Sequence, residues 1–337
     1  MRIAITADPL IPVPPENYGG IERIIDFLAT ELTNRGHEVL LAAHPASSVH
    51  VPLLPYKNLG VNLAGHLSNV ATIAKIRRFK PNIIHSFSRL AYLIPFFRSG
   101  VPKIMSYQRE PTISQVKRAV KLAKKGSLSF TGCSDYISDK VKPYASCRTV
   151  YNGVDMQKYR LSPEVDIGAP LVFLGRIEPN KGTRTAVNVA IASQRRIIIA
   201  GNIPNEYKSY FDGEIKPMLN EDIEYFGPIN DSQKNELLGR CAALLMPIAW
   251  NEPFGIVMAE AMACGTPVIG FNKGSVPEII VNGINGFKCD TQDEMIQLVQ
   301  EVKKLNRRDV RREAEERFSS SKIVDEYMKV YCDLLSN

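Results

Sequence analysis

The sequence predicts an α/β protein made of two doubly wound domains, each a parallel sheet with helices on both faces, which face each other across a cleft. Three observations lead to this prediction. The chain has 337 residues, too many for one ordinary core and suited to two domains of about 150 residues each. Short apolar strands alternate with amphipathic helices along the chain. One segment, 161–170, interrupts this alternation with Pro, Gly and acidic residues.

The first half of the chain contains one series of strands and helices. A first helix is predicted after residue 20, because apolar residues recur at helical spacing from Ile21 to Leu32 and Gly36 then ends the run. Strands are predicted at residues 2–7, 38–43, 83–85 and 128–132. This series is assigned to an N-terminal domain of residues 1–162.

The second half of the chain repeats the pattern. Strands are predicted at residues 171–174, 197–200, 223–226, 243–246 and 267–270, each followed by a helix or a turn. They are assigned to a C-terminal domain of residues 163–319. A last helix, at about residues 320–337, is expected to pack back onto the N-terminal domain.

The composition is typical of a soluble globular protein, and the cysteines favour the cytosol. Hydrophobic residues make up 45% of the chain and charged residues 23%, and no run of about 18 apolar residues could span a membrane. Asp8 interrupts the apolar residues at the start, so the sequence shows no signal peptide. The six cysteines lie far apart with no C-x-x-C pair, which favours reduced thiols over disulfides or a zinc site.

Positive charge is concentrated in the first half. Residues 1–165 contain 22 Lys and Arg against 11 Asp and Glu, a net charge of +11, whereas the remainder has a net charge of −4. Residues 114–126 contain five cations and no acid, and Val116, Val120 and Ala123 are predicted to form one apolar face of a helix. Two interpretations follow: a solvated helix face, or a peripheral contact with an anionic membrane at the inner membrane face.

Two candidate anion sites follow predicted strands. In the segment 14–22, Gly19 and Gly20 leave the backbone bare at a helix N-terminus, where unpaired N–H groups bind anions. Arg176 and Lys181 follow the strand at 171–174, and a planar guanidinium with a compact ammonium can neutralise a diphosphate. The alternatives are a structural turn in the first case and solvated surface cations in the second.

The strongest candidate site contains two glutamates eight residues apart. Glu252 lies in a Pro-Phe-Gly loop before a helix predicted to begin near Ile256, and Glu260 lies about one turn inside that helix. Both carboxylates can then point into one cleft and accept hydrogen bonds from sugar or ribose hydroxyls. Backbone N–H groups near Phe254 and Gly255 would add donors for hydroxyl or phosphate oxygens.

Together these segments resemble the family-4 retaining glycosyltransferases. The resemblance is carried by Pro-Pro-x-x-Tyr-Gly-Gly-Ile-Glu at 14–22, Arg-Gly-His-Glu-Val at 35–39, Tyr-Asn-Gly-Val-Asp at 151–155, Leu-Gly-Arg at 174–176 with Lys-Gly at 181–182, the glutamate motif at 252–260, and Asn-Gly-Ile-Asn-Gly-Phe at 282–287. The matches run in order through nearly the whole chain. The resemblance implies the GT-B fold of two Rossmann-like domains, with the acceptor on the N-terminal domain and the nucleotide sugar on the C-terminal domain.

The resemblance also implies how the donor is bound. The expected donor-binding residues are Gly19, Gly20, Arg176, Lys181, Pro228, Ile229, Glu252, Phe254, Gly255, Ile256 and Glu260. Arg176 and Lys181 would clamp the diphosphate as it leaves. Glu260 would hold the ribose hydroxyls and Glu252 those of the transferred sugar, while the base rests against residues 226–229.

Catalysis in this family depends on positioning and charge stabilisation. The acceptor hydroxyl attacks on the leaving-group face, and the departing phosphate takes its proton. The residues assigned to catalysis are Glu252, Arg176, Lys181 and His85. The family often has His where this chain has Phe87 and Gln108, so the acceptor-side candidates are Gln108, Arg109 and Glu110.

The sequence therefore predicts a cytoplasmic transferase that moves a hexose from a nucleotide sugar, a UDP-sugar before a GDP-sugar, to a hydroxyl acceptor. The acceptor could be a soluble metabolite, a glycan or a lipid-linked molecule. No cofactor, metal or nucleic acid is expected, because no two aspartates lie two residues apart and the histidines lack metal-ligand spacing. Two alternatives stay open: a nucleotide-sugar epimerase of the same fold, and a basic membrane- or polyanion-binding protein without transferase activity.

Overall fold

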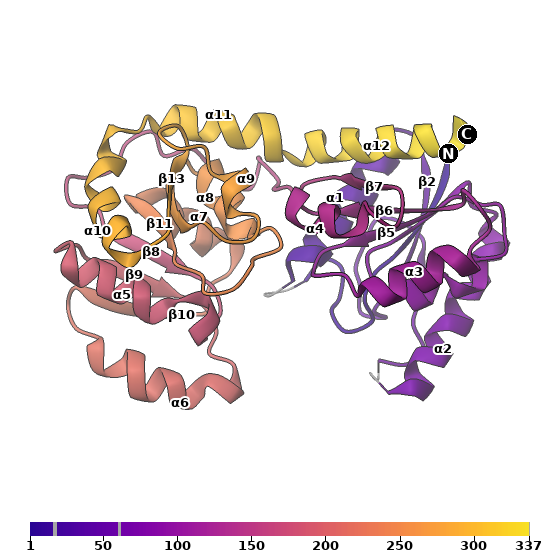
Figure 1. Cartoon of the computed structure of the whole chain (residues 1–337), viewed down its shortest axis with the longest axis horizontal. Helices are drawn as coiled ribbons and strands as arrows, with labels where there is room; N and C mark the ends of the chain where they lie inside the picture. The colour runs from indigo at the N-terminus through magenta and orange to yellow at the C-terminus, as the bar shows by residue number, and fades with distance from the viewer. Residues whose placement is uncertain (16–18, 60–61, 337) are drawn as a thin grey trace. The chain divides into compact units, whose positions relative to one another are not determined.

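The computed structural model describes residues 1–15, 19–59 and 62–336, and it divides into two compact units (Figure 1). The N-terminal unit comprises Met1–Asn152 and Ser320–Asn337, and the C-terminal unit comprises Gly153–Ser319. Residues 16–18, which belong to the motif at 14–22, lie outside the described part of the chain.

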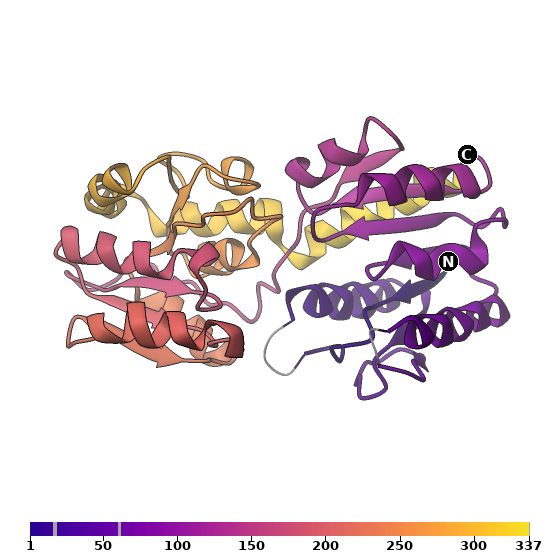
Figure 2. The same ribbon diagram turned by 60° about the horizontal axis from the view of Figure 1, so that its bottom comes forward.

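The N-terminal unit is built on a parallel sheet, whose seven described strands have the order β3-β2-β1-β4-β5-β6-β7. The strands are β1 (Arg2–Thr6), β2 (Glu38–Ala43), β3 (Leu53–Pro55), β4 (Ile83–Ser86), β5 (Lys103–Tyr107), β6 (Leu128–Gly132) and β7 (Cys147–Thr149). The helical segments are α1 (Gly20–Asn34), α2 (Leu63–Ala74), η1 (Lys75–Phe79), η2 (Leu90–Phe96), α3 (Ile113–Leu122), α4 (Asp135–Val141) and α12 (Ser320–Ser336). Between β3 and β4 the chain crosses from one edge of the sheet to the other side of β1, the change of direction that defines a doubly wound sheet. Helices α1 and α12 lie side by side on one face, and α2 lies on the other (Figures 1 and 2).

The C-terminal unit has a second parallel sheet, whose six described strands have the order β10-β9-β8-β11-β12-β13. The strands are β8 (Leu171–Leu174), β9 (Ile197–Ala200), β10 (Ile223–Gly227), β11 (Ala243–Met246), β12 (Val268–Phe271) and β13 (Gly286–Cys289). The α-helices are α5 (Thr183–Ala192), α6 (Lys208–Tyr210), α7 (Asp231–Arg240), α8 (Ile256–Ala263), α9 (Val276–Ile279), α10 (Gln292–Glu301) and α11 (Arg307–Phe318). Shorter helical turns are η3 (Pro179–Lys181), η4 (Asn205–Tyr207), η5 (Phe211–Ile215), η6 (Lys216–Met218) and η7 (Val302–Lys304).

The two sheets confirm the predicted fold class, and they also contain strands that the sequence did not predict. Central strands such as β9, Ile-Ile-Ile-Ala, are buried along their whole length, as expected for a sheet covered on both faces. The unpredicted strands are β3, β5, β7 and β13. β5 begins with Lys103, which is buried and donates hydrogen bonds from its ammonium to the carbonyls of Ser99 (2.9 Å) and Val101 (2.7 Å). A charged residue interrupts an apolar pattern in the sequence, so the pattern alone did not predict this strand. The structure shows the carbonyl groups that allow Lys103 to be buried.

The division between the units falls at Asn152 and Gly153, about ten residues before the predicted end of the N-terminal domain. The segment after it is tied to α11 by two arginines. Arg307 donates to the carbonyl of Ser162 (2.6 Å) and, from its buried end, to the carbonyls of Gly239 and Cys241 (both 2.9 Å). Arg311 donates to the carbonyl of Tyr159 (2.6 Å). Residues 153–162 therefore belong to the C-terminal unit, although they precede its first strand.

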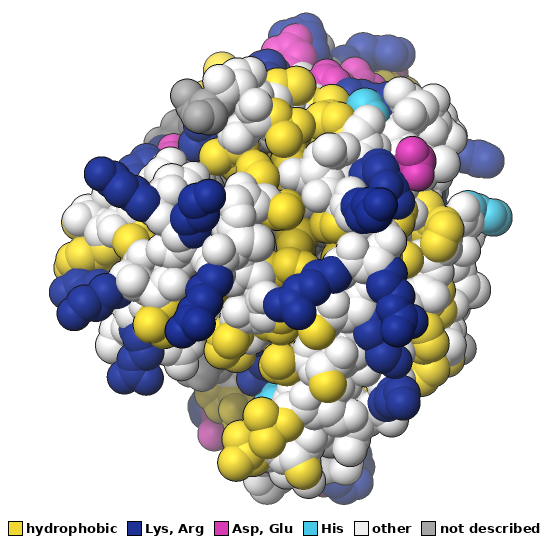
Figure 3. All heavy atoms as spheres, turned by 90° about the vertical axis from the view of Figure 1, so that its right-hand side faces the viewer, with side chains coloured by type: hydrophobic (Ala, Val, Ile, Leu, Met, Phe, Trp, Pro, Cys, Tyr) yellow, Lys and Arg dark blue, Asp and Glu magenta, His cyan; other side chains and the backbone are white. Residues whose placement is uncertain are grey.

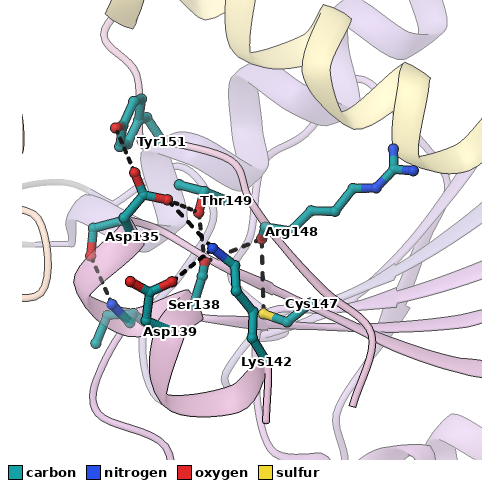
Figure 4. A network of polar contacts seen from close by, with 10 residues as sticks. Asp135, Ser138, Asp139, Lys142, Cys147, Arg148, Thr149 and Tyr151 are labelled. Atoms are coloured by element: carbon teal, nitrogen blue, oxygen red, sulfur yellow. Dashed lines mark hydrogen bonds and ion pairs between the residues drawn. The ribbon is translucent and has the colours of Figure 1, made fainter. Parts of the chain in front are cut away.

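A compact polar network closes the N-terminal unit where α4 meets β7 (Figure 4). The Thr149 hydroxyl lies 2.5 Å from a carboxylate oxygen of Asp135, at the start of α4, and 2.9 Å from the Ser138 hydroxyl. Tyr151 donates to the other Asp135 oxygen (3.4 Å), and Lys142 pairs with Asp139 (2.7 Å). These contacts hold the last strand of the sheet just before the chain enters the C-terminal unit.

Helix α3 confirms part of the predicted basic helix and corrects its apolar face. The helix ends at Leu122, so Ala123 and the cations after it lie beyond its end. Val116 and Ala119 are the buried positions, whereas Val120, predicted to be on the apolar face, is 38% exposed. The helix therefore packs through two small side chains and leaves its cations in solvent. No described helix is long and apolar enough to cross a membrane.

The last helix, α12, is attached to the N-terminal sheet through His85. Its ring nitrogens form hydrogen bonds with the hydroxyls of Tyr331 on α12 (2.7 Å) and Ser106 on β5 (2.6 Å). Ser106 in turn lies 2.5 Å from Thr131 on β6, and Tyr327 packs 4.9 Å from the His85 ring. Burial lowers the pKa of His85 to about 3, because the interior does not solvate a charged ring.

This burial predicts a pH-dependent stability. His85 has a pKa of about 3 in the folded protein, whereas a histidine in an unfolded chain has a pKa of about 6.5. The unfolded chain therefore binds the proton more readily. The free energy of unfolding should therefore fall as the pH falls below about 6.5, by about 1.4 kcal/mol per pH unit for this group. Urea denaturation between pH 7 and pH 5 measures the slope.

The matched comparison is His85→Gln, which keeps a polar side chain and removes the titrating group. The free energy of unfolding of the variant should fall less steeply with decreasing pH than that of the parent, whatever the stability of the variant at pH 7. Equal slopes in the two proteins would mean that His85 is charged, or reachable by water, in the folded state.

Candidate functional site

The predicted site residues of the C-terminal unit come from loops that follow parallel strands. Arg176 and Lys181 follow β8, and Glu252 follows β11, the neighbour of β8 in the sheet. The carboxyl ends of parallel strands lie along one edge, so these side chains meet there although they are distant in the sequence. Glu260 lies on α8, which begins at Ile256 as predicted.

Glu252 is paired directly with Lys181. The Lys181 ammonium lies 2.5 Å from a carboxylate oxygen of Glu252, and the indole N–H of Trp250 donates to the same oxygen (3.1 Å). Lys181 also lies 4.9 Å from the centre of the Trp250 ring, within the range of a cation–π contact. Only 18% of the Lys181 side chain and 11% of the Glu252 side chain are exposed. The sequence placed both residues in one site but did not predict that they neutralise each other.

The backbone around Glu252 is fixed by close contacts. The N–H of Ser275 donates to the carbonyl of Glu252 (2.9 Å). Gly274 has φ +58°, and a Cβ there would come within 2.4 Å of the Glu252 backbone, so only glycine fits this close approach. Gly255, with φ +72°, sits at the start of α8. Phe254 is 2% exposed and packs against Phe318, so its side chain belongs to the core of the unit.

Glu260 is held by two residues that the sequence did not single out. The hydroxyl of Tyr159 and the ammonium of Lys234 both donate to Oε1 of Glu260, each at 2.6 Å. Lys234 also donates to the Tyr159 hydroxyl (3.2 Å) and pairs with Asp231 (3.3 Å). Tyr159 lies shortly after the Tyr-Asn-Gly-Val-Asp motif at 151–155. That motif could have identified Tyr159 as a candidate site residue. Lys234 lies on α7 and has no comparable motif.

The other predicted donor residues occupy more open positions. Arg176 pairs with Glu178 (3.2 Å) and is 36% exposed along its side chain, whereas Glu178 is buried. Pro228 is exposed and Ile229 is half-buried, both in the turn after β10. Phe226, beside them, is 49% exposed, and the guanidinium of Arg240 lies 5.8 Å from the centre of its ring.

In the N-terminal unit, the paired glycines lie at the start of α1, as predicted. Gly19 has φ +151°, and a Cβ there would come within 2.8 Å of an Oε atom of Glu22 and 2.7 Å of Pro15. Glu22 is 4% exposed. Burial raises its pKa, and the charge of Asp8 raises it further. The bare helix start is therefore combined with a buried carboxyl group, which the sequence did not predict.

Beside Glu22 the N-terminal unit contains a cavity of about 650 Å³ at the carboxyl edge of its sheet. The three acceptor-side candidates Gln108, Arg109 and Glu110 all line it. His85 is not one of its lining residues: it is fully buried, and both ring nitrogens are engaged by α12 and β5. The structure thus brings the acceptor-side candidates together around one cavity and places His85 in the interior. Among the described residues no group of His, Cys, Asp and Glu is arranged to hold a metal ion.

Two family models match the chain. Residues 18–158 match the model described as Glycosyltransferase Family 4, and residues 167–322 match the model described as Glycosyl transferases group 1. N-acetyl-alpha-D-glucosaminyl L-malate synthase of Bacillus anthracis is 30% identical over 217 residues, which cover 58% of this chain and 56% of that protein. The chain therefore spans just over half the length of that relative.

Solved structures share the fold over the whole chain. AviGT4, a glycosyltransferase involved in avilamycin A biosynthesis, has a TM-score of 0.78 at 23% identity and covers 100% of this chain and 98% of its own. Anabaena Alr3699/HepE in complex with UDP-glucose has a TM-score of 0.78 at 19% identity, covering 99% and 100%. At these identities the likeness shows a common GT-B fold of two α/β domains.

The pairing of Lys181 with Glu252 predicts a measurable coupling. Lys181→Met removes the cation from a largely buried carboxylate and should lower the free energy of unfolding by about 1–3 kcal/mol. Adding Glu252→Gln removes the uncompensated charge and should recover most of that loss. Urea denaturation of the parent, the two single variants and the double variant completes the cycle. Losses that simply add would show that the two side chains do not interact in solution.

Proposed function

The chain belongs to the family-4 glycosyltransferases with the GT-B fold, and from this premise we propose that it transfers a hexose from a nucleotide sugar to a hydroxyl acceptor with retention of anomeric configuration. The observation that carries the proposal is the pair of carboxylates, Glu252 and Glu260, each held at 2.5–2.6 Å from a lysine at one edge of the C-terminal sheet. Buried carboxylates with charged partners are well placed to bind hydroxyl groups of a sugar donor.

Arg176 and Lys181 are proposed to bind the diphosphate of the donor. Arg176 is partly exposed and Lys181 is held in place by Glu252. When the diphosphate arrives, the ammonium of Lys181 can turn from Glu252 to phosphate, exchanging one anion for another. Glu252 is then released to accept hydrogen bonds from the hydroxyls of the sugar. The two cations stabilise the negative charge that develops on the leaving group.

Glu260 is proposed to bind the ribose hydroxyls. Tyr159 and Lys234 both donate to Oε1, so the carboxylate is oriented before a ligand arrives and Oε2 is the oxygen offered to the ribose. The exposed turn at 226–229 then provides a surface for the base. A uridine donor is favoured by the family resemblance, and HepE, a protein of this fold, has been solved with UDP-glucose.

The proposed transfer needs no protein base. The acceptor hydroxyl forms the new glycosidic bond on the face from which the nucleoside diphosphate departs, and the departing phosphate oxygen takes the hydroxyl proton. The protein contributes position and charge stabilisation. The acceptor is proposed to occupy the cavity of the N-terminal unit, where Gln108, Arg109 and Glu110 line the wall, and the reaction is proposed to take place in the cytoplasm.

Replacing each glutamate separates the two proposed roles. Glu260→Ala should weaken binding of UDP, because the ribose loses its acceptor. Glu252→Ala should leave UDP affinity unchanged or raise it, because Lys181 is freed, while turnover of UDP-glucose falls about 100-fold or more. Calorimetry with UDP and a nucleotide-release assay with UDP-glucose measure both, with Glu206→Ala, an exposed acid of the same unit, as the control.

The outcomes also separate the alternative functions. An epimerase would release nucleotide and a free, altered sugar with no acceptor present. A polyanion-binding protein would show no nucleotide release from UDP-glucose or GDP-mannose at all. Weaker UDP binding in Glu252→Ala than in Glu260→Ala would reverse the assigned roles.

A peripheral contact with an anionic membrane is proposed for the basic segment 114–126. The cations of α3 and the turn after it are exposed, and Lys and Arg side chains are spread over the face of the N-terminal unit seen in Figure 3. A cation near an anionic surface contributes about 1 kcal/mol, so several could hold the protein there reversibly. Val116 and Ala119 are turned inward, and the exposed apolar side chains of α3 are Val120 (38%) and Leu122 (60%). This apolar surface is small, so attachment would be mainly electrostatic.

Sedimentation with vesicles tests this contact. The protein should bind vesicles containing phosphatidylserine at low salt and dissociate near half-molar salt, because ions screen surface charges. Changing Lys121, Lys124 and Lys125 to Gln should remove binding, whereas the same change at Lys303 and Lys304, exposed cations of the C-terminal unit, should not. Absence of binding at low salt would leave α3 as a solvated helix face.

A further inference from the structure

We infer that the cavity of the N-terminal unit binds an amphiphilic acceptor, one with an uncharged, hydroxyl-bearing head and an apolar tail. This inference rests on the proposed transfer function, because it names the class of molecule that receives the sugar. It is drawn from three properties of the cavity wall: buried polar atoms without partners, the lack of an unpaired charge in its buried part, and leucines that remain in solvent at its edge.

The polar part of the wall presents hydrogen-bonding atoms that nothing in the described chain satisfies. Ser88 is 3% exposed and its hydroxyl has no partner among the described residues. The amide oxygen and nitrogen of Gln108 are both buried and equally unsatisfied within the described chain. Both residues line the cavity. Burying such atoms without a partner is unfavourable, so a ligand with groups that both donate and accept, as hydroxyls do, fits this wall.

Two ion pairs involve charged side chains of the wall. Arg89 faces Asp8, with 3.9 Å between the guanidinium and the carboxylate, and Glu110 pairs with Lys140 outside the cavity (2.5 Å). Burial raises the pKa of Glu22, which favours its neutral form. Arg109 also lines the cavity and has no ion pair among the described residues, but its side chain is exposed to solvent. The buried part of the wall therefore offers a strongly charged head group no unpaired partner of opposite sign. The head group is therefore assigned as uncharged.

The edge of the cavity is apolar and open to solvent. Leu10 is 48% exposed and Leu63, at the start of α2, is 75% exposed, and both line the cavity. Leu67, one helical turn further along α2, is 61% exposed. A free hexose bound at the polar part of the cavity wall would leave these leucine side chains exposed to solvent. An alkyl or lipid tail attached to the hexose would cover them. Large apolar side chains at the mouth of a binding cavity are typical of a surface that a ligand completes.

The alkyl glucosides test this inference with the full-length protein. Binding of methyl, butyl, hexyl and octyl β-D-glucoside, each below its critical micelle concentration, is measured by saturation-transfer NMR in the presence of UDP. Affinity should rise with chain length, by up to about fourfold per methylene while the tail covers the leucines. Octyl glucoside should bind better than glucose, and glucose 6-phosphate should gain nothing from its charge.

Three variants assign the contributions of head and tail. Leu63→Ser should flatten the dependence on chain length, and because this side chain lies in solvent the change should not affect folding. Gln108→Leu should weaken all four glucosides by a similar factor. Ile191→Ser, a matched change at a 52% exposed residue of the C-terminal unit, should leave the series unchanged.

The two ways of failing are distinguishable. If UDP binds and UDP-glucose is turned over but methyl and octyl glucoside bind equally, or glucose 6-phosphate binds best, the amphiphile inference is wrong and the transfer function stands. If the chain-length dependence is present but no nucleotide sugar is bound, the transfer function is wrong.

Discussion

All the recorded strand pairs in both sheets are parallel, and this one constraint decides where chemistry can occur. In a parallel sheet every segment that follows a strand emerges at the same edge, and the return segments lie at the other. Ser88 after β4 and Gln108 after β5 therefore share one cavity in the N-terminal unit. Arg176 after β8 and Glu252 after β11 share one edge in the C-terminal unit. Each group of residues comes from loops that are far apart in the sequence but leave the sheet at the same edge.

The predicted site residues of the C-terminal unit balance one another's charges. Lys181 neutralises Glu252, and Lys234 with Tyr159 neutralises Glu260. Isolated charges in such partly buried places would be unfavourable, so pairing is what allows a polar site to exist inside a stable unit. The two pairs differ in what a ligand would do to them. In the proposed function Lys181 changes partners when a diphosphate binds, whereas Lys234 and Tyr159 stay in place and keep Glu260 oriented.

His85 shows how a residue type that suggests catalysis can be used to build the fold. It stands at the carboxyl end of β4, where family resemblance draws attention to histidines, yet its nitrogens bind Tyr331 and Ser106 in the interior. Because Tyr331 belongs to α12, this contact fastens the last helix of the chain to the sheet formed by its first residues. A neutral imidazole suits the position, since one nitrogen can donate while the other accepts.

From the sequence alone, the alternation of strands and helices determined two parallel-sheet domains, and the loop at 252–255 determined that α8 starts between the two glutamates. These are local properties, because the spacing of apolar residues and the residues of a turn are both found within a short stretch of sequence. The partners of the site residues are not local. Lys181 and Glu252 are 71 residues apart, Tyr159 and Glu260 are 101, and His85 and Tyr331 are 246. Strand order and helix packing decide which of these side chains meet. For that reason only the tertiary structure could show that Glu252 and Glu260 are each paired with a lysine, that His85 is interior, and that the N-terminal cavity has a polar wall and an apolar edge.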